Sequence, residues 1–291
     1  MSVIRLLLCL TFLFPLAADA QSIGTVTLAE GPLKLLRGTG VFAAAEGLRV
    51  NEGDILDSAG AGVTQLELVD GTIVMLSGAS RLFVYSYPLQ GAGSMELILF
   101  SGWLKAGTKK GEPPAERRYT TLLLGAATPD ATLVMRADGE GVELFLESGS
   151  AKLGEVGSLG QLAAERAARS GEFAARTAGR ALQTSARPPA AFVSKVPVPF
   201  RDTPPSRMAR YKDREIEPKR ERDATYEDVA DLLKLPRNWR KGVVKRFQPR
   251  TKDPAFRAAL DANMKLHPEW DRILHPEKYL PKKPPVVAPV N

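Results

Sequence analysis

The chain has 291 residues, with 40 Lys and Arg against 33 Asp and Glu, which gives a formal net charge of +7. Its single cysteine excludes a disulfide framework, and with only two histidines it is poorly supplied with thiolate or imidazole metal ligands. The charge is uneven. Residues 21–157 carry 11 basic and 16 acidic side chains, a net of −5, whereas residues 158–291 carry 28 and 16, a net of +12.

Residues 1–20 are predicted to be a cleavable signal peptide. Arg5 precedes the apolar run Leu6–Leu16, and Ala18–Ala20 supplies the small residues of a cleavage site, so Gln21 is the expected mature start. The run is shorter than the roughly 20 apolar residues of a membrane-spanning helix, and no later segment approaches that length. We therefore expect a periplasmic chain whose mature form has no transmembrane span.

Cys9 leaves one alternative open, which is lipid attachment. Leu7 and Leu8 stand before it, where a lipoprotein site has small residues, and it lies inside the apolar run rather than after it. With Cys9 removed in the signal peptide, the mature chain would carry no thiol. Export also removes nucleic acid as the expected partner of the basic half and leaves lipid headgroups, lipopolysaccharide and cell-wall polymers.

Residues 21–157 are predicted to form one β-rich domain. Its short apolar runs, rich in β-branched and aromatic residues, end at Gly, Asp, Asn, Ser or Pro, as is typical of strands joined by tight turns. The clearest runs are Val63–Val69, Thr72–Ser77, Arg81–Tyr85, Met95–Phe100 and Val142–Glu147. Asp70-Gly71, between two of them, is a strong hairpin signal.

Alternation within these runs indicates which side chains are buried. Leu66 and Leu68 are expected to face the core, and Gln65 and Glu67 are expected to face water. No amphipathic segment of helical length lies between the strands, which excludes a βαβ fold. The expected fold is mainly β: a multi-stranded all-β domain, built as a rolled sheet, a sandwich or a short β-helix-like stack. A small α-helical, partly disordered C-terminal extension follows it.

Residues 158–223 are predicted to be a connector. Its first part, residues 161–187, is rich in Ala and Arg, and we expect it to be partly helical. Gly171 and Gly179 weaken that expectation, because each costs about 1 kcal/mol relative to alanine in a helix interior.

The second part of the connector, residues 187–223, is rich in proline, which removes hydrogen-bond donors and favours extended backbone. Phe192 and Phe200 lie in it, so we expect this part to lie along another surface. The charged run Tyr211–Asp223 has almost no apolar residues and is not expected to bury enough surface to fold.

Residues 224–280 are predicted to form a small helical module. A capping-box pattern starts at Thr225, an Asp-Pro helix start lies at Asp253, and a third short helix is expected from Pro268. A module of this size without disulfides or metal is marginal alone, so we expect it to dock on the β-domain. Residues 281–291 are expected to be a disordered tail.

The order of several motifs in the β-domain resembles the FecR-type periplasmic domain. That family combines a Gly-Asp after an apolar residue, an alternating strand, an Asp-Gly-Ser/Thr turn, a second apolar strand and a serine. The matching positions are Glu52-Gly53-Asp54, Leu66, Leu68, Asp70-Gly71-Thr72, Val74, Leu76 and Ser80. Two later segments are similar to its following and closing strands: Leu99–Ala106 and Val142–Glu155.

The resemblance implies an all-β envelope module that senses or contacts partners and catalyses no reaction. The best-known members relay the state of an outer-membrane transporter to a cytoplasmic sigma factor. This sequence departs from that plan, because a predicted signal peptide stands in place of a cytoplasmic sigma-binding segment and a membrane span. We therefore do not carry direct sigma-factor control over to this chain.

Candidate catalytic and metal-binding residues are sparse. Glu140, Glu143 and Glu147 offer paired carboxylates for glycoside hydrolysis, but their strand pattern favours a solvated face. His267 and His275 are each followed by proline, and their spacing of eight fits metal ligation poorly. We expect no enzyme activity, no cofactor and no metal. Trp103, beside Gly102 on a strand, offers a sugar-stacking platform, but we expect it in the core.

A basic cluster in the helical module is the most suggestive contact surface. It comprises Arg237, Arg240, Lys241, Lys245, Arg246 and Arg250, next to Trp239 and Phe247. It is a candidate for polyanion or headgroup contact, and an ordinary solvated helix is the alternative. The resulting hypothesis is a non-catalytic FecR-like protein that binds a protein or envelope partner in envelope signalling or maintenance. The alternative is a structural protein that binds the cell wall or an anionic polymer.

Overall fold

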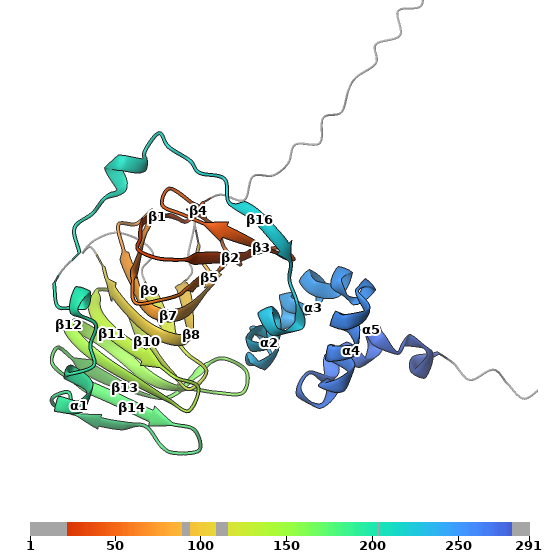
Figure 1. The fold of residues 1–291 in the computed structure, drawn as a ribbon. Coiled ribbons are helices and arrows are strands. Elements are labelled where there is room, and N and C mark those ends of the chain that lie inside the picture. The colour runs from red at the N-terminus through yellow and green to blue at the C-terminus, as the bar shows by residue number, and fades with distance from the viewer. Residues whose placement is uncertain (1–21, 89–93, 109–115, 203, 281–291) are drawn as a thin grey trace, which may run out of the picture.

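The computed structural model describes residues 22–88, 94–108, 116–202 and 204–280 (Figure 1). In this part the chain is mainly β, with a small helical region towards the C-terminus, as predicted. The predicted signal peptide and the predicted tail, residues 281–291, lie outside the described residues. Among those described, no helix is long and apolar enough to cross a membrane.

The strands pair into one 16-stranded sheet that folds into two layers. Layer 1 runs in the order β16 (Lys219–Asp223), β3 (Gly40–Ala44), β2 (Leu33–Arg37), β5 (Ile55–Ser58), β7 (Ile73–Ser86), β8 (Ser94–Gly107), β9 (Glu116–Thr120), β10 (Leu124–Thr128), β12 (Gly141–Val156) and β13 (Leu162–Arg169). Layer 2 runs in the order β4 (Arg49–Val50), β1 (Gly24–Ala29), β6 (Val63–Leu68), β7, β8, β11 (Ala131–Ala137), β12, β14 (Phe173–Thr177) and β15 (Gln183–Ser185).

Three long strands, β7, β8 and β12, belong to both layers because each bends at a glycine. The glycines are Gly78, Gly102 and Gly149, with φ of +69°, +90° and +81°. At Gly102 a Cβ would lie 2.1 Å from Ser80 Oγ, so only glycine fits there. The pairings are antiparallel except for β8 with β9 in the described part. This antiparallel pattern identifies a two-layer sandwich with shared strands, rather than a β-helix-like stack.

The space between the layers holds the main core. Its side chains alternate along the strands of both layers and include the predicted inward residues Leu66 and Leu68. The predicted Asp70-Gly71 turn joins β6 and β7, and the Asp70 carboxylate accepts a hydrogen bond from the Thr72 backbone N at 3.0 Å. Asp70 also forms a buried ion pair with Arg117 on β9 at 2.7 Å.

The helical module covers the outer face of layer 1. It contains α2 (Tyr226–Lys234), α3 (Lys241–Phe247), α4 (Pro254–Ala262) and α5 (Asp271–Leu274), with short 3₁₀ turns between them. The predicted capping box is present, since the Asp228 carboxylate accepts a hydrogen bond from the Thr225 backbone N at 2.7 Å. Asp253 caps α4 as expected. Apolar side chains of layer 1, among them Phe83 and Phe100, join Phe247 and those of the other helices in one buried cluster. The predicted docking is therefore present.

The outer face of layer 2 is covered by a linear segment, described at residues 186–202 and 204–218, which we call the strap. It leaves β15, passes through the short helix α1 (Ala190–Val193) and runs up the side of the β-domain to β16 (Figure 1). Phe192 and Phe200 of the strap are buried with Val63, Met75, Val134 and Phe173 of layer 2. The expectation that the proline-rich part lies along another surface is correct.

Two expectations about the connector are wrong. Residues 161–187 are not helical but form β13, β14 and β15, which continue the sheet from β12. Their small side chains suit strands at the sheet margin, and Gly171, with φ of +89°, forms the turn that a helix would not allow. Residues 219–223, inside the charged run, form the edge strand β16 on β3. Backbone pairing orders them without apolar burial.

Candidate functional site

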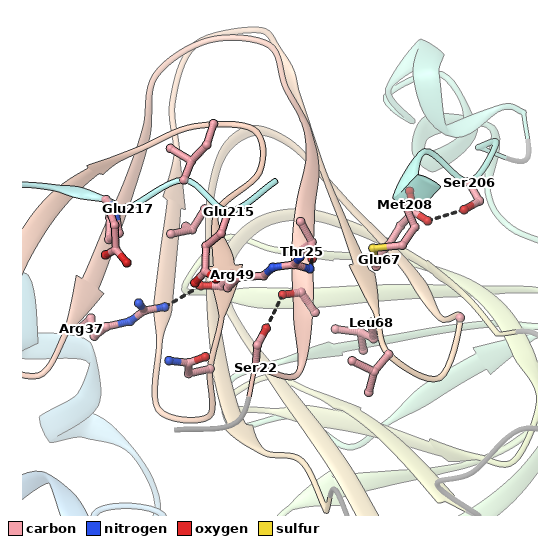
Figure 2. Close-up of a pocket in the computed structure, with 17 residues that line it drawn as sticks. Ser22, Thr25, Arg37, Arg49, Glu67, Leu68, Ser206, Met208, Glu215 and Glu217 are labelled. Atoms are coloured by element: carbon pink, nitrogen blue, oxygen red, sulfur yellow. Dashed lines mark hydrogen bonds between the residues drawn. The ribbon is translucent and has the colours of Figure 1, made fainter. Parts of the chain in front are cut away.

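A pocket of about 900 Å³ opens at the end of the molecule where the strap crosses the N-terminal strands (Figure 2). We call it the end pocket. Its walls come from two regions far apart in sequence, namely β1 to β6 with their turns and the last part of the strap. They comprise Ser22, Gly24, Thr25, Arg37, Leu48, Arg49, Asn51, Glu67, Leu68, Val69, Gly71, Ser206, Met208, Glu215, Ile216, Glu217 and Pro218.

The cations of the end pocket are held by partners within the chain. Arg37 donates to both oxygens of Asp54, at 2.9 and 2.6 Å, and this contact raises the pKa of Arg37. Arg49 donates to Thr25 Oγ1 at 2.6 Å and to the carbonyl of Tyr211 in the strap at 2.9 Å. Figure 2 shows Arg49 near the middle of the pocket, close to Glu215. These guanidinium groups are thus fixed in position.

Glu67 is the buried carboxylate of the pocket and is only 3% exposed. It accepts hydrogen bonds from Thr27 Oγ1 and Gln65 Nε2 of layer 2, and from Ser206 Oγ and the Arg207 backbone N of the strap. Burial alone would raise its pKa, but the four hydrogen bonds outweigh burial and hold the pKa below its ordinary value. The expectation that Gln65 and Glu67 face water fails because the strap covers them.

The strap closes the pocket on the side of the β1–β4 strands. The Ile216 backbone N donates to the carbonyl of Gly47 at 3.3 Å, and the Ile216 side chain lies 3.0 Å from where a Cβ of Gly47 would stand. Gly47 also has φ of +91°, so a side chain here would strain the backbone and push the strap away. Glu215 and Glu217 are exposed at the rim.

One acceptor of the end pocket is left without a partner. Asn51 Oδ1 is buried and has no hydrogen-bond partner within the described residues. The accessible acceptors of the pocket are the exposed carboxylates of Glu215 and Glu217, while Arg37 and Arg49 are already engaged. The arrangement therefore suits a polar group that donates hydrogen bonds, such as a lysine or arginine side chain or a main-chain amide.

The structure divides the predicted basic cluster into two groups. Arg237, Lys241 and Lys245 are exposed; Lys241 and Lys245 lie one turn apart on α3, and Arg237 lies in the turn before it. With Val244 and Pro268, two of them line a shallow pocket of about 570 Å³. These three remain a predicted polyanion contact.

The other three arginines of the cluster make contacts within the chain. Arg246 donates to the carbonyls of Leu36, Gly38 and Gly53. Burial lowers its pKa to about 10, so it remains charged at neutral pH. It therefore ties α3 to the turns of layer 1.

Arg240 acts within the helical module, and Arg250 also joins the module to β16. Arg250 pairs with Asp223 at 2.8 Å and with Asp253 at 2.5 Å. Arg240 donates to the carbonyl of Leu233 at 2.8 Å and pairs with Glu269 at 3.2 Å. Their charges are balanced by these partners, so they contribute less to an attractive surface than the exposed three.

The carboxylates considered for catalysis also have partners. Glu143 pairs with Arg136 at 3.0 Å, and Glu147 pairs with Lys105 at 2.8 Å, while Glu140 is exposed. No group of three or more potential metal-ligating side chains lies together in the described part of the chain.

The remaining candidates have structural environments. His267 is fully buried with its Nε2 at 3.1 Å from the carbonyl of Leu260, and burial lowers its pKa. His275 lies 2.7 Å from Asp261. Trp103 is not in the core between the layers, since it lies on the outer face of layer 2 with its ring centroid 5.6 Å from that of Phe192.

Comparisons with known proteins give limited support. No family model matches the chain, and no curated protein matches it. Two crystal structures with similarity are described as "a putative anti-sigma factor from Parabacteroides distasonis ATCC 8503", at 12% and 11% sequence identity and a TM-score of 0.37 for each. The similarity covers 46% of this chain and 59% of theirs, so the chain spans less than two thirds of those neighbours. At this level it assigns no function.

The end pocket was not visible in the sequence. Arg49 and Tyr211 lie 162 positions apart, and Glu67 meets Ser206 over 139 positions. The one signal was indirect: Gln65 and Glu67 alternate with buried leucines, which is equally consistent with a solvated face. Only the course of the strap shows that these polar side chains have a partner.

Proposed function

We propose that the chain is a non-catalytic, FecR-like protein of the periplasm that binds a protein or envelope partner in envelope signalling or maintenance. The proposal draws on the FecR-like motifs of the β-domain and on the predicted signal peptide. The structural observation that carries it is the end pocket, where the N-terminal strands and the strap enclose an open volume with two exposed carboxylates, Glu215 and Glu217, at its rim.

The state of the charged groups in the pocket supports binding rather than catalysis. A general base needs a carboxylate that is free and has a pKa near the working pH. Glu67 instead accepts four hydrogen bonds and has a lowered pKa, and Arg37 is neutralised by Asp54. Groups arranged in this way define a shape and a pattern of acceptors, which is what recognition of a partner requires.

Site-specific photocrosslinking in cells tests this function. A photoreactive residue is placed at Val69 or Glu215 on the rim, and at Lys152 on β12 as an exposed control outside the pocket. We expect the two rim positions to capture the same partner, identified by mass spectrometry, and the control position not to. Cell fractionation of the same strains tests the predicted periplasmic location.

Replacement of a rim carboxylate sharpens the test. Glu217→Gln removes the charge of an exposed side chain and keeps its size, so capture from Val69 should fall at least several-fold while the chain stays folded. Equal capture from Lys152, or unchanged capture with Glu217→Gln, would show that the end pocket does not bind the partner.

The exposed basic side chains at α3 favour a second candidate function, binding to an anionic envelope polymer. Lys241 and Lys245 of α3 and Arg237 in the turn before it make a row of exposed basic side chains at four-residue intervals in the sequence. Co-sedimentation with purified cell-wall sacculi at low and high salt tests it, since contact through such a row should weaken steeply as salt rises. A triple charge-to-glutamine variant that sediments like the unmodified chain would remove this option.

A further inference from the structure

The strap is held on layer 2 by two aromatic anchors. Phe192 is 1% exposed and packs against Trp103, Phe145 and Phe173, with ring centroids 5.6, 6.5 and 5.1 Å away. Phe200 is completely buried. Between the anchors most of the strap is exposed, with Val198 at 66%, and Val196 is partly buried against layer 2. The contact is therefore made by a few inserted side chains and not by a continuous packed surface.

Buried polar side chains of layer 2 hold the main chain of the strap. Lys105, 4% exposed, donates from Nζ to the carbonyls of Phe200 at 2.5 Å and Asp202 at 3.3 Å. Gln65 donates to the carbonyl of Pro205 at 3.0 Å. Side chains that bind backbone carbonyls in this way recognise the course of a linear segment and are indifferent to most of its side chains.

The strap does not fill the surface on which it lies. A pocket of about 340 Å³ remains between Pro204 and Ser206 of the strap and Ile73, Lys105 and Thr132 of layer 2. The space next to Lys105 is therefore large enough for a side chain that the strap lacks.

We propose that this face of layer 2 is a binding groove for linear peptide segments, and that the strap occupies it in cis. The partner segment is basic and proline-rich, and it carries two aromatic side chains eight positions apart, as Phe192 and Phe200 are. The charges agree with this choice, because residues 187–212 hold six Lys and Arg against one Asp, whereas residues 21–157 carry a net of −5. This inference goes beyond the proposed function and does not depend on the end pocket.

When the strap leaves the groove, both of its ends stay attached to the sheet at β15 and β16, so it continues to compete with a partner segment. A tethered segment competes at a high effective concentration, in the millimolar range for short flexible linkers. A partner in trans must then exceed the strap in affinity, for example by filling the space next to Lys105, or must meet a chain whose strap has been released.

A binding measurement with the strap's own sequence tests the groove. The full chain carrying Phe192→Ala and Phe200→Ala releases the anchors, and release is verified by faster protease cleavage within residues 187–212. A fluorescent peptide of residues 187–212 is then titrated and followed by anisotropy. We expect it to bind this double variant at least tenfold more tightly than the unmodified chain, whose groove is occupied.

Two matched comparisons identify the binding surface. Adding Lys105→Met to the double variant should weaken peptide binding at least tenfold, whereas adding Lys152→Met, at an exposed position of β12, should not change it. A peptide in which both Phe residues are Ala should not bind. If the double variant does not fold, Phe200→Ala alone releases one anchor and is measured in the same way.

Three outcomes would overturn the proposal. The first is a released strap with no peptide binding. The second is binding that Lys105→Met and Lys152→Met leave equally strong. The third is a concentration-dependent dimer of the unmodified chain, seen by light scattering, that the double variant does not form, because the groove would then take the strap of a second copy. If crosslinking from Val69 captures no partner but the peptide still binds the double variant, the proposed function of the end pocket fails and the groove proposal stands.

Discussion

The two layers of the β-domain are both covered on their outer faces, but by different means. On layer 1, apolar side chains of four helices join those of the sheet in one buried cluster. On layer 2, the strap adds two phenylalanines and a valine, and its other contacts include hydrogen bonds that the buried Lys105 donates and that the buried Glu67 accepts. One cover is a packed core, and the other is a peptide held at a few positions.

The difference has a thermodynamic consequence. A helix that shares a core with the sheet separates from it only at the cost of exposing much apolar area, so it unfolds together with the domain. A strap held by two anchors and several hydrogen bonds opens locally at a smaller cost. A mutation in the strap can then lower the free energy of unfolding of the β-domain by no more than the strap contributes when it is bound, because the strap detaches before the domain unfolds.

Alanine substitution of one buried phenylalanine in each cover tests this contrast most strongly. Phe247→Ala, in the layer 1 cluster, should lower the free energy of unfolding by about 3–5 kcal/mol, the usual cost of removing a buried aromatic ring. Phe192→Ala removes a ring that is equally buried but should cost less, because the strap detaches first. Denaturant titration gives both values.

Limited proteolysis distinguishes the two variants further. Phe192→Ala should expose residues 187–212 to cleavage with little change in the unfolding midpoint, whereas Phe247→Ala should shift the midpoint and leave the strap protected below it. If both variants lose the same global stability, the strap is part of the cooperative core, and the contrast between the covers is wrong.

A buried carboxylate on layer 1 allows a test by pH. Glu96 is 6% exposed on the outer face of layer 1, next to Ile98, and burial raises its pKa to about 7. Because the folded chain holds the proton more tightly than the unfolded chain, stability falls as pH rises from about 4.5 to 7. Glu96→Gln should then stabilise the protein at pH 8 by up to about 3 kcal/mol, at about 1.4 kcal/mol per pKa unit.

Glu67 under the strap should respond in the opposite sense. Its lowered pKa means that its contribution is present above the pKa of the unfolded chain and is lost as pH falls. Glu67→Gln should thus increase protease access to the strap at pH 7, and the difference from the unmodified chain should vanish in acid. A Glu96→Gln variant whose stability advantage does not grow between pH 5 and pH 8 would contradict the assignment for layer 1.

Features that depend on interactions between residues close in the sequence could be predicted, and features that depend on distant residues could not. The Asp70-Gly71 hairpin, the capping box at Thr225 and the helix start at Asp253 depend on residues within a few positions, and all three are present. The strands of residues 161–187 were missed because their small side chains carry little β preference. Their order comes from pairing: β13 pairs with the end of β12, directly before it, and β14 pairs with Gly141–Phe145 at the start of β12. Local preference yields to tertiary pairing there.

The candidate site was harder to predict for the same reason. Glu67 and Gln65 alternate with leucines whether a strap or water covers them, so the pattern cannot separate the two. The basic cluster shows the converse. Arg246 and Lys245 are neighbours of like charge in the sequence, yet one binds three carbonyls and the other is exposed, because a helix turns adjacent residues to different sides.

That pair provides a matched test of how the helical module is attached. Arg246→Met leaves the carbonyls of Leu36, Gly38 and Gly53 without their donor and should cost about 2 kcal/mol, since an unsatisfied buried group costs roughly 1–3 kcal/mol and one or two of these carbonyls can regain water. Lys245→Met should change stability little. Equal effects in thermal or denaturant unfolding would show that Arg246 does not hold α3 on layer 1.

The smallest expected effect lies where neither cover reaches, at the open edge of layer 1. Ala164 on β13 has φ of +50°, the left-handed region, at the irregularity where β13 pairs with Leu153 and Glu155 of β12. An alanine in this conformation costs roughly 1 kcal/mol that glycine avoids. Ala164→Gly should therefore stabilise the chain by up to about 1 kcal/mol.

The matched control for Ala164 lies on the same strand. Ala167 is exposed and pairs regularly with Lys152, so Ala167→Gly should destabilise by about 0.5–1 kcal/mol, the usual cost of glycine in a strand. The two Ala→Gly substitutions should therefore change the free energy of unfolding in opposite directions. Both alanines are exposed on the same strand, so the backbone φ angle is what distinguishes the two positions. A loss of stability with Ala164→Gly would mean that Ala164 does not hold the left-handed conformation and that β13 is a regular strand at this position.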